Sequence, residues 1–321
     1  MRKALCIGID DYLVSPLSGC INDATCISNL LAKNGDGSPN FDVIIKKNVL
    51  SKSVLKGLIA DLFIGDCDTV LLYFSGHGFL NELGGYIVTP DSKEYDEGVP
   101  MDDILTFANK SQIKNKIIIL DCCHSGAMGK PDVSDNKSIL SDGLTILTAS
   151  RDTETAIEIN GHGIFTNLLL EALNGGAADL RGQISPGGIY SFIDRSLGAW
   201  YQRPVFKTNV TRFISLRTVI PQVSDDILRS ITDFFHNPNY EFQLDPSFED
   251  TNSLDVDHKV IEPYATKENI TIFKRLQKLQ SIGLVVPSGA DFMYFAAMES
   301  KSCKLTPLGH HYWKLVNDGR I

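Results

Sequence analysis

The sequence of 321 residues lacks any apolar run of the roughly 18 residues that a membrane-spanning helix needs, so we expect no transmembrane segment. The apolar stretch at residues 4–9 is followed at once by Asp10 and Asp11, which is too early for the core of a signal peptide. We expect a buried strand there instead. Internal repeats and low-complexity segments are also missing.

Cysteine and positive charge are scarce as well. Seven cysteines without regular spacing are not the dense, even-numbered set of a secreted disulfide framework, so we expect a reducing, cytoplasmic location. Basic residues number 30 against 39 acidic ones, which gives a net charge of −9. This charge disfavours bulk attraction to nucleic acid or to an anionic membrane surface.

What the sequence does have is an alternation of short apolar segments and helical patterns over its first two thirds. The predicted strands cover residues 4–9, 43–45, 69–74, 117–120 and 144–148, and the predicted helices cover residues 23–32, 51–62, 101–108 and 162–173. Such alternation indicates an α/β fold, a sandwich of a mostly parallel sheet with helices on both faces. In these sheets, functional sites form beyond the carboxyl ends of the strands.

The alternation stops near residue 217, and we predict one domain over residues 1–217 and a second over residues 218–321. The second is expected to contain a helix at 267–284, a hairpin of 293–298 with 302–306, and a final helix at 307–316. Gly283 marks the end of the first of these helices. This order is typical of a small α+β winged-helix domain.

The charge of the second domain leaves two roles open. Residues 264–321 carry a net charge of +4, with Lys274, Arg275 and Lys278 on one helix, whereas residues 221–263 carry −8. A winged helix of this charge could bind DNA, but the acidic segment before it weakens the field. A sensor or protein-interaction role is favoured over DNA binding.

Two segments of the first domain carry chemistry. In the first, at 71–78, an apolar strand leads into His77 between two glycines; in the second, at 117–126, a strand leads into Cys122 and Cys123. Both turns lie at carboxyl ends of predicted parallel strands. A thiol attacks a carbonyl as the thiolate, and a neighbouring imidazole can take its proton.

The second segment offers two thiols. Side chains alternate along a strand, so Cys123 should share a face with Asp121, and Cys122 should point into the core. The backbone amides of Gly78 and Cys123 are candidate oxyanion donors. The alternatives are a structural histidine, a buried inert cysteine, and a zinc site that includes His124, although the spacing is not that of a zinc motif.

The two segments resemble the paired His and Cys boxes of the metacaspases and bacterial caspase-like peptidases, and the likeness extends over residues 1–217. The resemblance implies a cysteine endopeptidase with His77 as general base and Cys123 as nucleophile. Its S1 pocket, which holds the side chain before the cleaved bond, corresponds to Cys20, Asp23, Ser75 and Asp121. Two carboxylates favour a cationic side chain, so the implied protein substrates are cleaved after Arg or Lys. Helix capping and strand-end hydrogen bonding are the alternative roles of the two aspartates.

The resemblance also implies a possible cofactor and a processing event. Many metacaspases need calcium, and their acidic site corresponds to Asp91, Asp102 and Asp103, but Lys130 stands where the family has a fourth acid. A solvated acidic turn and helix start is the alternative. The polar loop 126–143 lies where the family is often cut on activation, which makes Lys130 and Lys137 candidate self-cleavage sites.

The fusion of such a peptidase to an extra domain resembles bacterial effectors of antiviral defence. In those proteins the appended domain senses a small-molecule or protein activator, such as a nucleotide second messenger, and releases the protease. Two other functions stay open: a catalytically silent caspase homologue that acts as a scaffold, and a winged-helix DNA-binding regulator.

Overall fold

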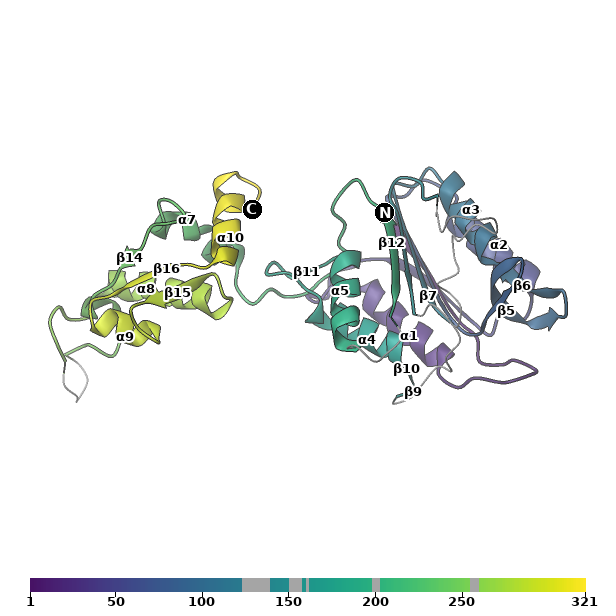
Figure 1. The fold of residues 1–321 in the computed structure, drawn as a ribbon, viewed down its shortest axis with the longest axis horizontal. Coiled ribbons are helices and arrows are strands. Elements are labelled where there is room, and N and C mark those ends of the chain that lie inside the picture. Colours follow the sequence, from purple (N-terminus) through teal and green to yellow (C-terminus); the bar gives the residue numbers. More distant parts are fainter. Residues whose placement is uncertain (123–138, 150–157, 160–161, 198–202, 255–259) are drawn as a thin grey trace. The chain divides into compact units, whose positions relative to one another are not determined.

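The computed structural model describes residues 1–122, 139–149, 158–159, 162–197, 203–254 and 260–321. The chain divides into two compact units, Met1–Ile220 and Pro221–Ile321 (Figure 1), close to the boundary predicted between residues 217 and 218. No helix within the described ranges is long and apolar enough to cross a membrane.

Among the described residues, six strands form the central sheet of the first unit. They are β1 (Arg2–Gly8), β2 (Asp42–Lys47), β3 (Thr69–Ser75), β7 (Asn115–Asp121), β8 (Leu144–Thr148) and β12 (Val205–Asn209), in the order β12-β8-β7-β3-β1-β2. All neighbours pair in parallel except β12, which runs antiparallel to β8. The predicted α/β fold with a mostly parallel sheet is confirmed.

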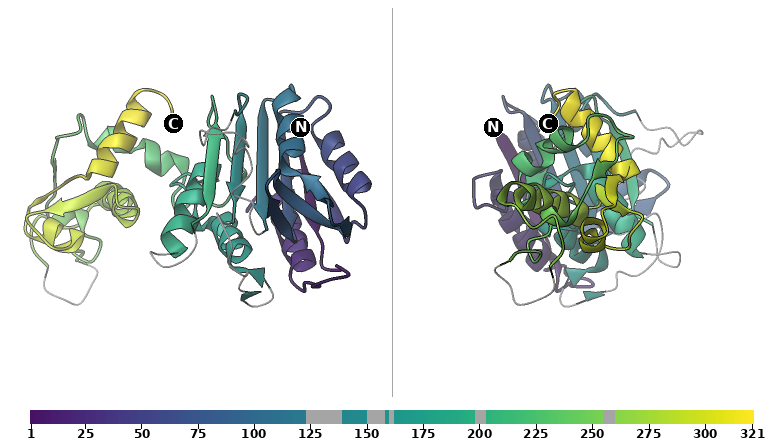
Figure 2. Two further views of the ribbon diagram at one scale, coloured as in Figure 1. Left: turned by 45° about the vertical axis from the view of Figure 1, so that its right-hand side comes forward. Right: turned by 90° about the vertical axis from the view of Figure 1, so that its left-hand side faces the viewer.

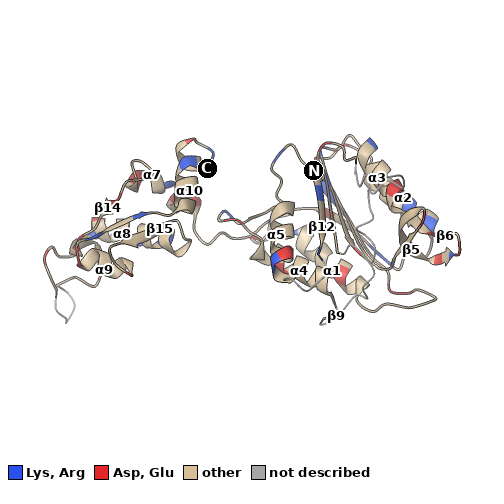
Figure 3. Ribbon diagram, viewed as in Figure 1, with Lys and Arg blue, Asp and Glu red and all other residues tan. Residues whose placement is uncertain are grey.

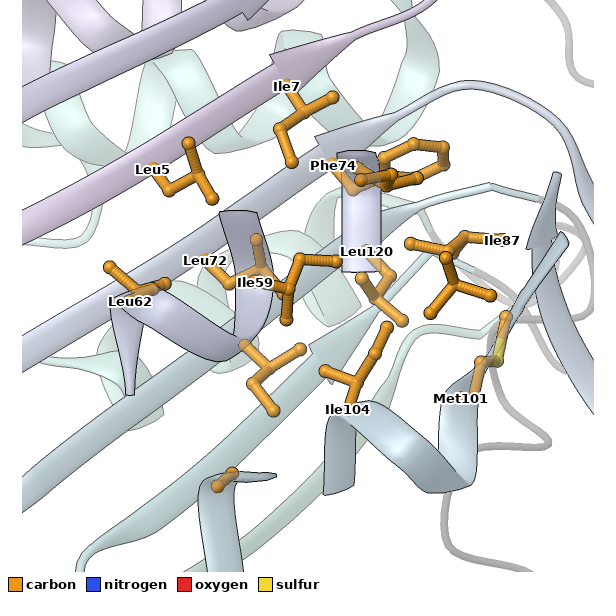
Figure 4. Packing of buried hydrophobic residues seen from close by; sticks show 14 of the residues in the cluster. Leu5, Ile7, Ile59, Leu62, Leu72, Phe74, Ile87, Met101, Ile104 and Leu120 are labelled. Carbon is orange, nitrogen blue, oxygen red and sulfur yellow. The ribbon is translucent and has the colours of Figure 1, made fainter. Parts of the chain in front are cut away.

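Helices cover both faces of this sheet (Figure 2). Helices α1 (Cys20–Ala32), α4 (Ile164–Glu171) and α5 (Pro186–Leu197) pack on one face, and α2 (Lys52–Leu62) and α3 (Met101–Lys110) pack on the other. The alternation of β3 shows why: Tyr73 packs toward α1, whereas Leu72 and Phe74 pack toward α2. Figure 4 shows the core between the sheet and the helices α2 and α3, where Leu72 and Phe74 pack with Ile59 of α2 and Ile104 of α3.

Several smaller elements were not predicted. Strands β4 (Gly78–Asn81), β5 (Gly84–Lys93) and β6 (Asp96–Pro100) form an antiparallel sheet, β9 (Glu158–Ile159) pairs with β10 (His162–Gly163), and β11 (Gln183–Ile184) pairs with β13 (Arg217–Thr218). A π-helical turn, η2 (Ala172–Gly176), extends α4. Most of these strands are short or rich in glycine and polar residues, and such segments give little alternation of apolar side chains.

The carboxyl ends of three central strands lie level with one another. The pairing register sets Gly8 of β1 beside Ser75 of β3, and Ser75 beside Asp121 of β7. The chain segments that follow these strands therefore leave the same edge of the sheet, next to one another. One of those segments holds His77, and another begins with Cys122.

Helix α1 begins at the same edge because β1 lets it come close. A Cβ atom at Gly8 would lie 2.2 Å from the carbonyl oxygen of Cys20, so a side chain does not fit there. Asp10 then accepts hydrogen bonds from the backbone N–H groups of Cys20 and Ile21 at 2.9 and 3.2 Å. These contacts cap the first turn of α1 and fix it against the strand ends.

The second unit combines short helices with a small antiparallel sheet. Its elements are α6 (Asp225–Arg229), α7 (Ile231–Phe234), β14 (Phe242–Gln243), η3 (Pro246–Phe248), α8 (Lys267–Ser281), β15 (Val285–Ser288), α9 (Met293–Met298), β16 (Ser302–Leu305) and α10 (Pro307–Asn317), with the sheet order β14-β16-β15. The predicted helix at 267–284 is confirmed as α8. The Thr266 side chain caps its start, and Gly283 follows its end at a φ of +76°.

The predicted strand at 293–298 is wrong, because these residues form the helix α9. Met293, Ala296 and Ala297 are buried, at the i, i+3, i+4 spacing of one helical face. The partner of β16 in the hairpin is instead β15. A short apolar run fits a strand and a buried helix equally well, so only packing decided between them.

Charged residues of both signs are interspersed on this second unit (Figure 3). On α8, Lys274 lies 2.9 Å from Asp250, and Arg275 lies 3.3 Å from Asp226. Two of the three basic side chains that suggested DNA binding are therefore paired with acidic residues of the same unit.

Candidate active site

The imidazole of His77 lies where the chain leaves β3. Its Nε2 atom is 2.6 Å from the backbone carbonyl oxygen of Ser15. Because a carbonyl oxygen only accepts hydrogen bonds, the neutral ring carries its proton on Nε2 and keeps the lone pair on Nδ1. Nδ1 is therefore the atom of His77 that is able to take a proton from a thiol.

Tyr12 supports His77 from the loop that follows β1. Its hydroxyl accepts a hydrogen bond from the backbone N–H of His77 at 3.0 Å and donates one to the carbonyl of Val88 at 3.3 Å. The rings of Tyr12 and His77 lie 4.5 Å apart between centroids. A Cβ atom at Gly76 would lie 2.5 Å from this hydroxyl, which explains the glycine before His77. Sequence reasoning missed Tyr12, because no local pattern links residue 12 to residue 77.

Asp121, the last residue of β7, and Cys122, the residue after it, point to opposite faces of the sheet. Cys122 is 5% exposed and packs with Leu120 in the core formed with α2 and α3. Asp121 hydrogen-bonds to Thr166 of α4 on the other face. The prediction that Cys122 is a core residue, on the face opposite to Asp121, is confirmed.

The predicted nucleophile itself, Cys123, lies outside the described residues, as do the candidate self-cleavage sites Lys130 and Lys137. Gly78, the other predicted oxyanion donor, is the first residue of β4 and pairs with Ile87 of β5. The roles of these residues stay predictions.

The four residues predicted for the S1 pocket lie together on the α1 face of the sheet. We call Cys20, Asp23, Ser75 and Asp121 the acidic cluster. The Ser75 hydroxyl donates to Oδ2 of Asp23 at 3.2 Å and hydrogen-bonds to the Cys20 thiol. Asp23 and Ser75 are each 2% exposed, and the charge of Asp23 raises the pKa of Asp121. Residues from α1, β3 and the end of β7 thus meet in one acidic group, in which Cys20, Asp23 and Ser75 are buried and Asp121 is half-buried.

Two residues that sequence reasoning missed complete this group. The Thr166 hydroxyl donates to Oδ2 of Asp121 at 2.5 Å, and the Tyr73 hydroxyl lies 2.6 Å from the Thr166 hydroxyl. Both side chains are fully buried. The signal that could have found them is weak: each is a polar residue inside an otherwise apolar segment, where a buried hydroxyl needs a partner.

Burial controls the protonation of this group. The pKa of Asp121 is raised to about 7: burial raises it most, the charge of Asp23 also raises it, and the hydrogen bonds of Thr166 lower it. Burial also raises the pKa of the Cys20 thiol and of the Tyr73 phenol. Near neutral pH, Cys20 and Tyr73 are therefore uncharged, whereas Asp121 is divided between its two forms.

The three residues predicted to bind calcium have other surroundings. Both carboxylate oxygens of Asp91 accept the backbone N–H of Lys52, at 3.1 and 3.2 Å, and Asp103 lies 2.6 Å from the ammonium of Lys56. Asp102 precedes Asp103 in the first turn of α3. Within the described residues, no three His, Cys, Asp or Glu side chains form a group that could hold a metal ion. Calcium binding by Asp91, Asp102 and Asp103 stays a prediction.

The contact of Asp91 with Lys52 predicts a structural effect instead. Lys52 is the first residue of α2, so Asp91 acts as a cap from β5. We expect Asp91→Ala to lower the free energy of unfolding by about 1 kcal/mol, measured by chemical denaturation in the presence of a chelator. The control is Asp96→Ala, which removes only an exposed ion pair with Lys52 and should cost at most about 0.5 kcal/mol. Equal effects of the two variants would contradict the capping role.

The family model of the caspase domain, peptidase C14, matches residues 1–212. The chain belongs to the caspase family. Among solved structures, the caspase domain is similar to caspase-1 from Spodoptera frugiperda, with 15% identity, a TM-score of 0.49, and coverage of 68% of this chain and 90% of that one. A comparison with curated proteins finds no match.

The predicted resemblance is thus confirmed for the first unit. The matched caspase region includes the central sheet, His77, Cys123 and the whole acidic cluster, and it ends before the second unit. At the level of its family, the chain is a caspase-like cysteine peptidase, a hydrolase whose substrates are proteins.

Proposed function

We propose that this caspase-domain protein is an endopeptidase that cleaves proteins after Arg or Lys, with Cys123 as nucleophile and His77 as base. The observation that carries the proposal is the acidic cluster, with its half-buried Asp121, at the same strand ends that lead into His77 and Cys123. The carboxylates of Asp23 and Asp121 match the charge of a guanidinium or ammonium group, and the fork of a guanidinium suits them best. An acidic substrate side chain would be repelled there.

In the first half of the reaction, Nδ1 of His77 takes the proton of the Cys123 thiol, and the sulfur forms a bond to the substrate carbonyl carbon. The backbone N–H groups of Gly78 and Cys123 donate to the resulting oxyanion. As the carbon–nitrogen bond breaks, the imidazolium returns its proton to the leaving amine. The carbonyl of Ser15 holds the ring in the orientation that this transfer needs.

In the second half, His77 takes a proton from water, and the hydroxyl oxygen attacks the thioester carbon. The carbon–sulfur bond then breaks, the thiolate regains a proton, and the carboxylic acid product leaves. None of these steps requires a metal ion.

Fluorogenic peptides that differ only in the residue before the cleaved bond test the proposal. We expect turnover with Arg and Lys and none with Asp. A rate that is lost in chelator and restored by calcium would support the predicted calcium site. Turnover after Asp alone would refute the assignment of the acidic cluster. No turnover in either solution, with and without the second unit, would favour the silent scaffold.

Tyr12 is predicted to affect the rate of this reaction through His77. The change Tyr12→Phe removes the hydroxyl that accepts the backbone N–H of His77 but keeps the ring that packs against the imidazole. We expect kcat to fall about tenfold with KM nearly unchanged, because a displaced base slows proton transfer but not binding. Steady-state kinetics measure both constants. A rise in KM at constant kcat would contradict this role.

Self-cleavage at Lys130 or Lys137 is a further prediction from the basic specificity. If the enzyme cuts its own polar loop, the purified chain should yield two fragments, and the cleaved bond between them should lie within residues 126–143. The double variant Lys130→Ala/Lys137→Ala should stay intact, as should Cys123→Ala. The same fragments from the double variant, seen by intact-protein mass spectrometry, would contradict these sites.

The second unit is proposed to regulate the peptidase by binding a small-molecule or protein activator. Its support is that the unit is compact and has its own buried core, in which Phe273, Leu276 and Leu279 of α8 are fully or almost fully buried. A winged-helix fold, a bacterial defence role and a cytoplasmic location stay proposals beside it. Activation of the full chain, but not of residues 1–220, by one ligand would support regulation.

A further inference from the structure

The hydroxyl of Thr166 stands between two other oxygen atoms of the buried acidic group. It lies 2.5 Å from Oδ2 of Asp121 and 2.6 Å from the hydroxyl of Tyr73. An ionised carboxylate only accepts hydrogen bonds, so Thr166 donates to Asp121 and must accept from Tyr73. The three side chains thus form a chain of hydrogen bonds with one direction, and every donor points toward the carboxylate.

The backbone fixes the same contact a second time. Thr166 is the third residue of α4, and its backbone N–H also bonds to Asp121. Gly163, at the N-cap of α4, allows this approach, since a Cβ atom there would lie 3.0 Å from Oδ2 of Asp121. Asp121 therefore caps α4 from the end of β7, and one of its oxygens is held in place while the carboxylate stays beside Asp23.

The hydrogen bonds of Thr166 and the other surroundings of Asp121 have opposite effects on the pKa of its carboxyl group. Among the side chains that the structure describes, the ionisable groups that interact with Asp121 are Asp23 and Cys20 of α1 and Tyr73 of β3. Burial and the charge of Asp23 raise the pKa of Asp121, and Thr166 is the group that lowers it. Without Thr166, a larger fraction of Asp121 would be neutral at physiological pH.

We propose that Thr166, supported by Tyr73, is a positioning residue for Asp121 and so a determinant of the preference for a cationic over a neutral substrate side chain. The inference rests on the proposed function, since it assumes that Asp121 meets the substrate residue before the cleaved bond. Thr166 itself does not touch the substrate. Its effect is to hold the acceptor oxygen in place and to favour the charged form that attracts a cation.

The test compares Thr166→Val, which keeps the shape of the side chain but not its hydroxyl, with Thr166→Ser, which keeps the hydroxyl. The substrates are two peptides that differ only in Arg or its neutral analogue citrulline before the cleaved bond. For each variant, kcat/KM is measured from pH 5 to 9 on the full chain, beside the thermal unfolding temperature. The citrulline profile reports the ionisation of the Cys123–His77 pair alone, and the difference from the Arg profile isolates Asp121.

We expect Thr166→Val to move the acid limb of the Arg profile up by about one pH unit, because a hydrogen bond to a charged group is lost. Near pH 6 this shift is about a tenfold loss in kcat/KM for Arg, which recovers near pH 9. The citrulline profile should not move, and Thr166→Ser should match the wild type. Tyr73→Phe should cause a smaller shift in the same direction.

Two results would overturn the inference. One is a Thr166→Val profile for Arg that matches the wild type. The other is an equal loss for Arg and citrulline at every pH, which indicates a structural defect. Turnover by the wild type tests the proposed function, whereas the difference between the two Thr166 variants tests this inference. If the wild type cleaves Arg and citrulline peptides equally well, both the proposed basic specificity and the role of Thr166 in it are wrong.

Discussion

Replacement of Cys123 by Ala is expected to lower kcat/KM by at least about 10⁴-fold, whereas replacement of Cys122 by Ala should leave it within about threefold of the wild type. The two thiols are adjacent in sequence, but Cys122 is packed into the core between the sheet and α2 and α3. Removal of that thiol takes away a small apolar contact and leaves the nucleophile in place. Peptide turnover by the purified variants measures both effects.

The pair of variants is its own control, because each removes one sulfur atom from the same segment. Iodoacetamide provides a second measurement that does not depend on turnover. The wild type and Cys122→Ala should each contain one rapidly alkylated thiol, and Cys123→Ala should not contain it. Loss of activity in Cys122→Ala, with its fold intact by circular dichroism, would mean that the assignment of the nucleophile is wrong.

Asp121→Asn is expected to lower kcat/KM for Arg peptides by about 10²-fold or more, since it removes a buried charge that would pair with the substrate cation. The loss should be much smaller for citrulline peptides. In the wild type, turnover of Arg peptides should rise with pH through about 7, because the pKa of Asp121 is raised to about 7 and its charged form is the one that binds. Steady-state kinetics across pH measure these effects.

The same variant should stabilise the fold at high pH. The pKa of Asp121 is raised from 3.8 to about 7 on folding, so the folded state holds this proton more tightly than the unfolded chain. That contribution to stability is full below pH 3.8 and is lost as pH rises through about 7. Asn cannot ionise, so at pH 8 Asp121→Asn should unfold with a free energy higher by on the order of 4 kcal/mol at most, and at pH 4 it should nearly match the wild type.

A matched substitution separates this effect from a general effect of amides. Asp68 is exposed, and the N-terminal ammonium lowers the pKa of its carboxyl, so Asp68→Asn should not stabilise the protein at pH 8. Urea denaturation at the two pH values gives the comparison. If Asp121→Asn is less stable than the wild type at pH 8, the hydrogen bonds of Thr166 to the charged carboxylate outweigh the cost of its burial, and the predicted stabilisation is wrong.

The candidate site was predictable as far as it depends on strand ends. Apolar strands that lead into His77 and into Asp121 identify one edge of a parallel sheet, and the register of β3 with β7 brings Ser75 beside Asp121 there. The alternation of side chains along a strand was sufficient to place Cys122 in the core. Both are local rules that tertiary contacts reinforce.

The supporting residues were not predictable, because each acts across a large separation in sequence. Tyr12 meets His77, and Thr166 meets both Asp121 and Tyr73, only after β1, β3, β7 and α4 have packed. No periodicity in the sequence encodes such a contact between a hydroxyl and a distant group. The capping of α2 by Asp91 has the same origin.

By itself, the sequence determined the α/β class, the two segments that lead into His77 and Cys123, and the start of α8, because propensity, capping and alternation act over a few residues. The tertiary structure alone decided the surroundings of those residues. It made α9 a helix through the burial of Met293 and Ala297, and it joined Tyr73, Thr166 and Asp121 into one hydrogen-bonded chain. The physical reason is that burial, which sets the pKa of Asp121 and the partners of each hydroxyl, depends on how distant segments pack.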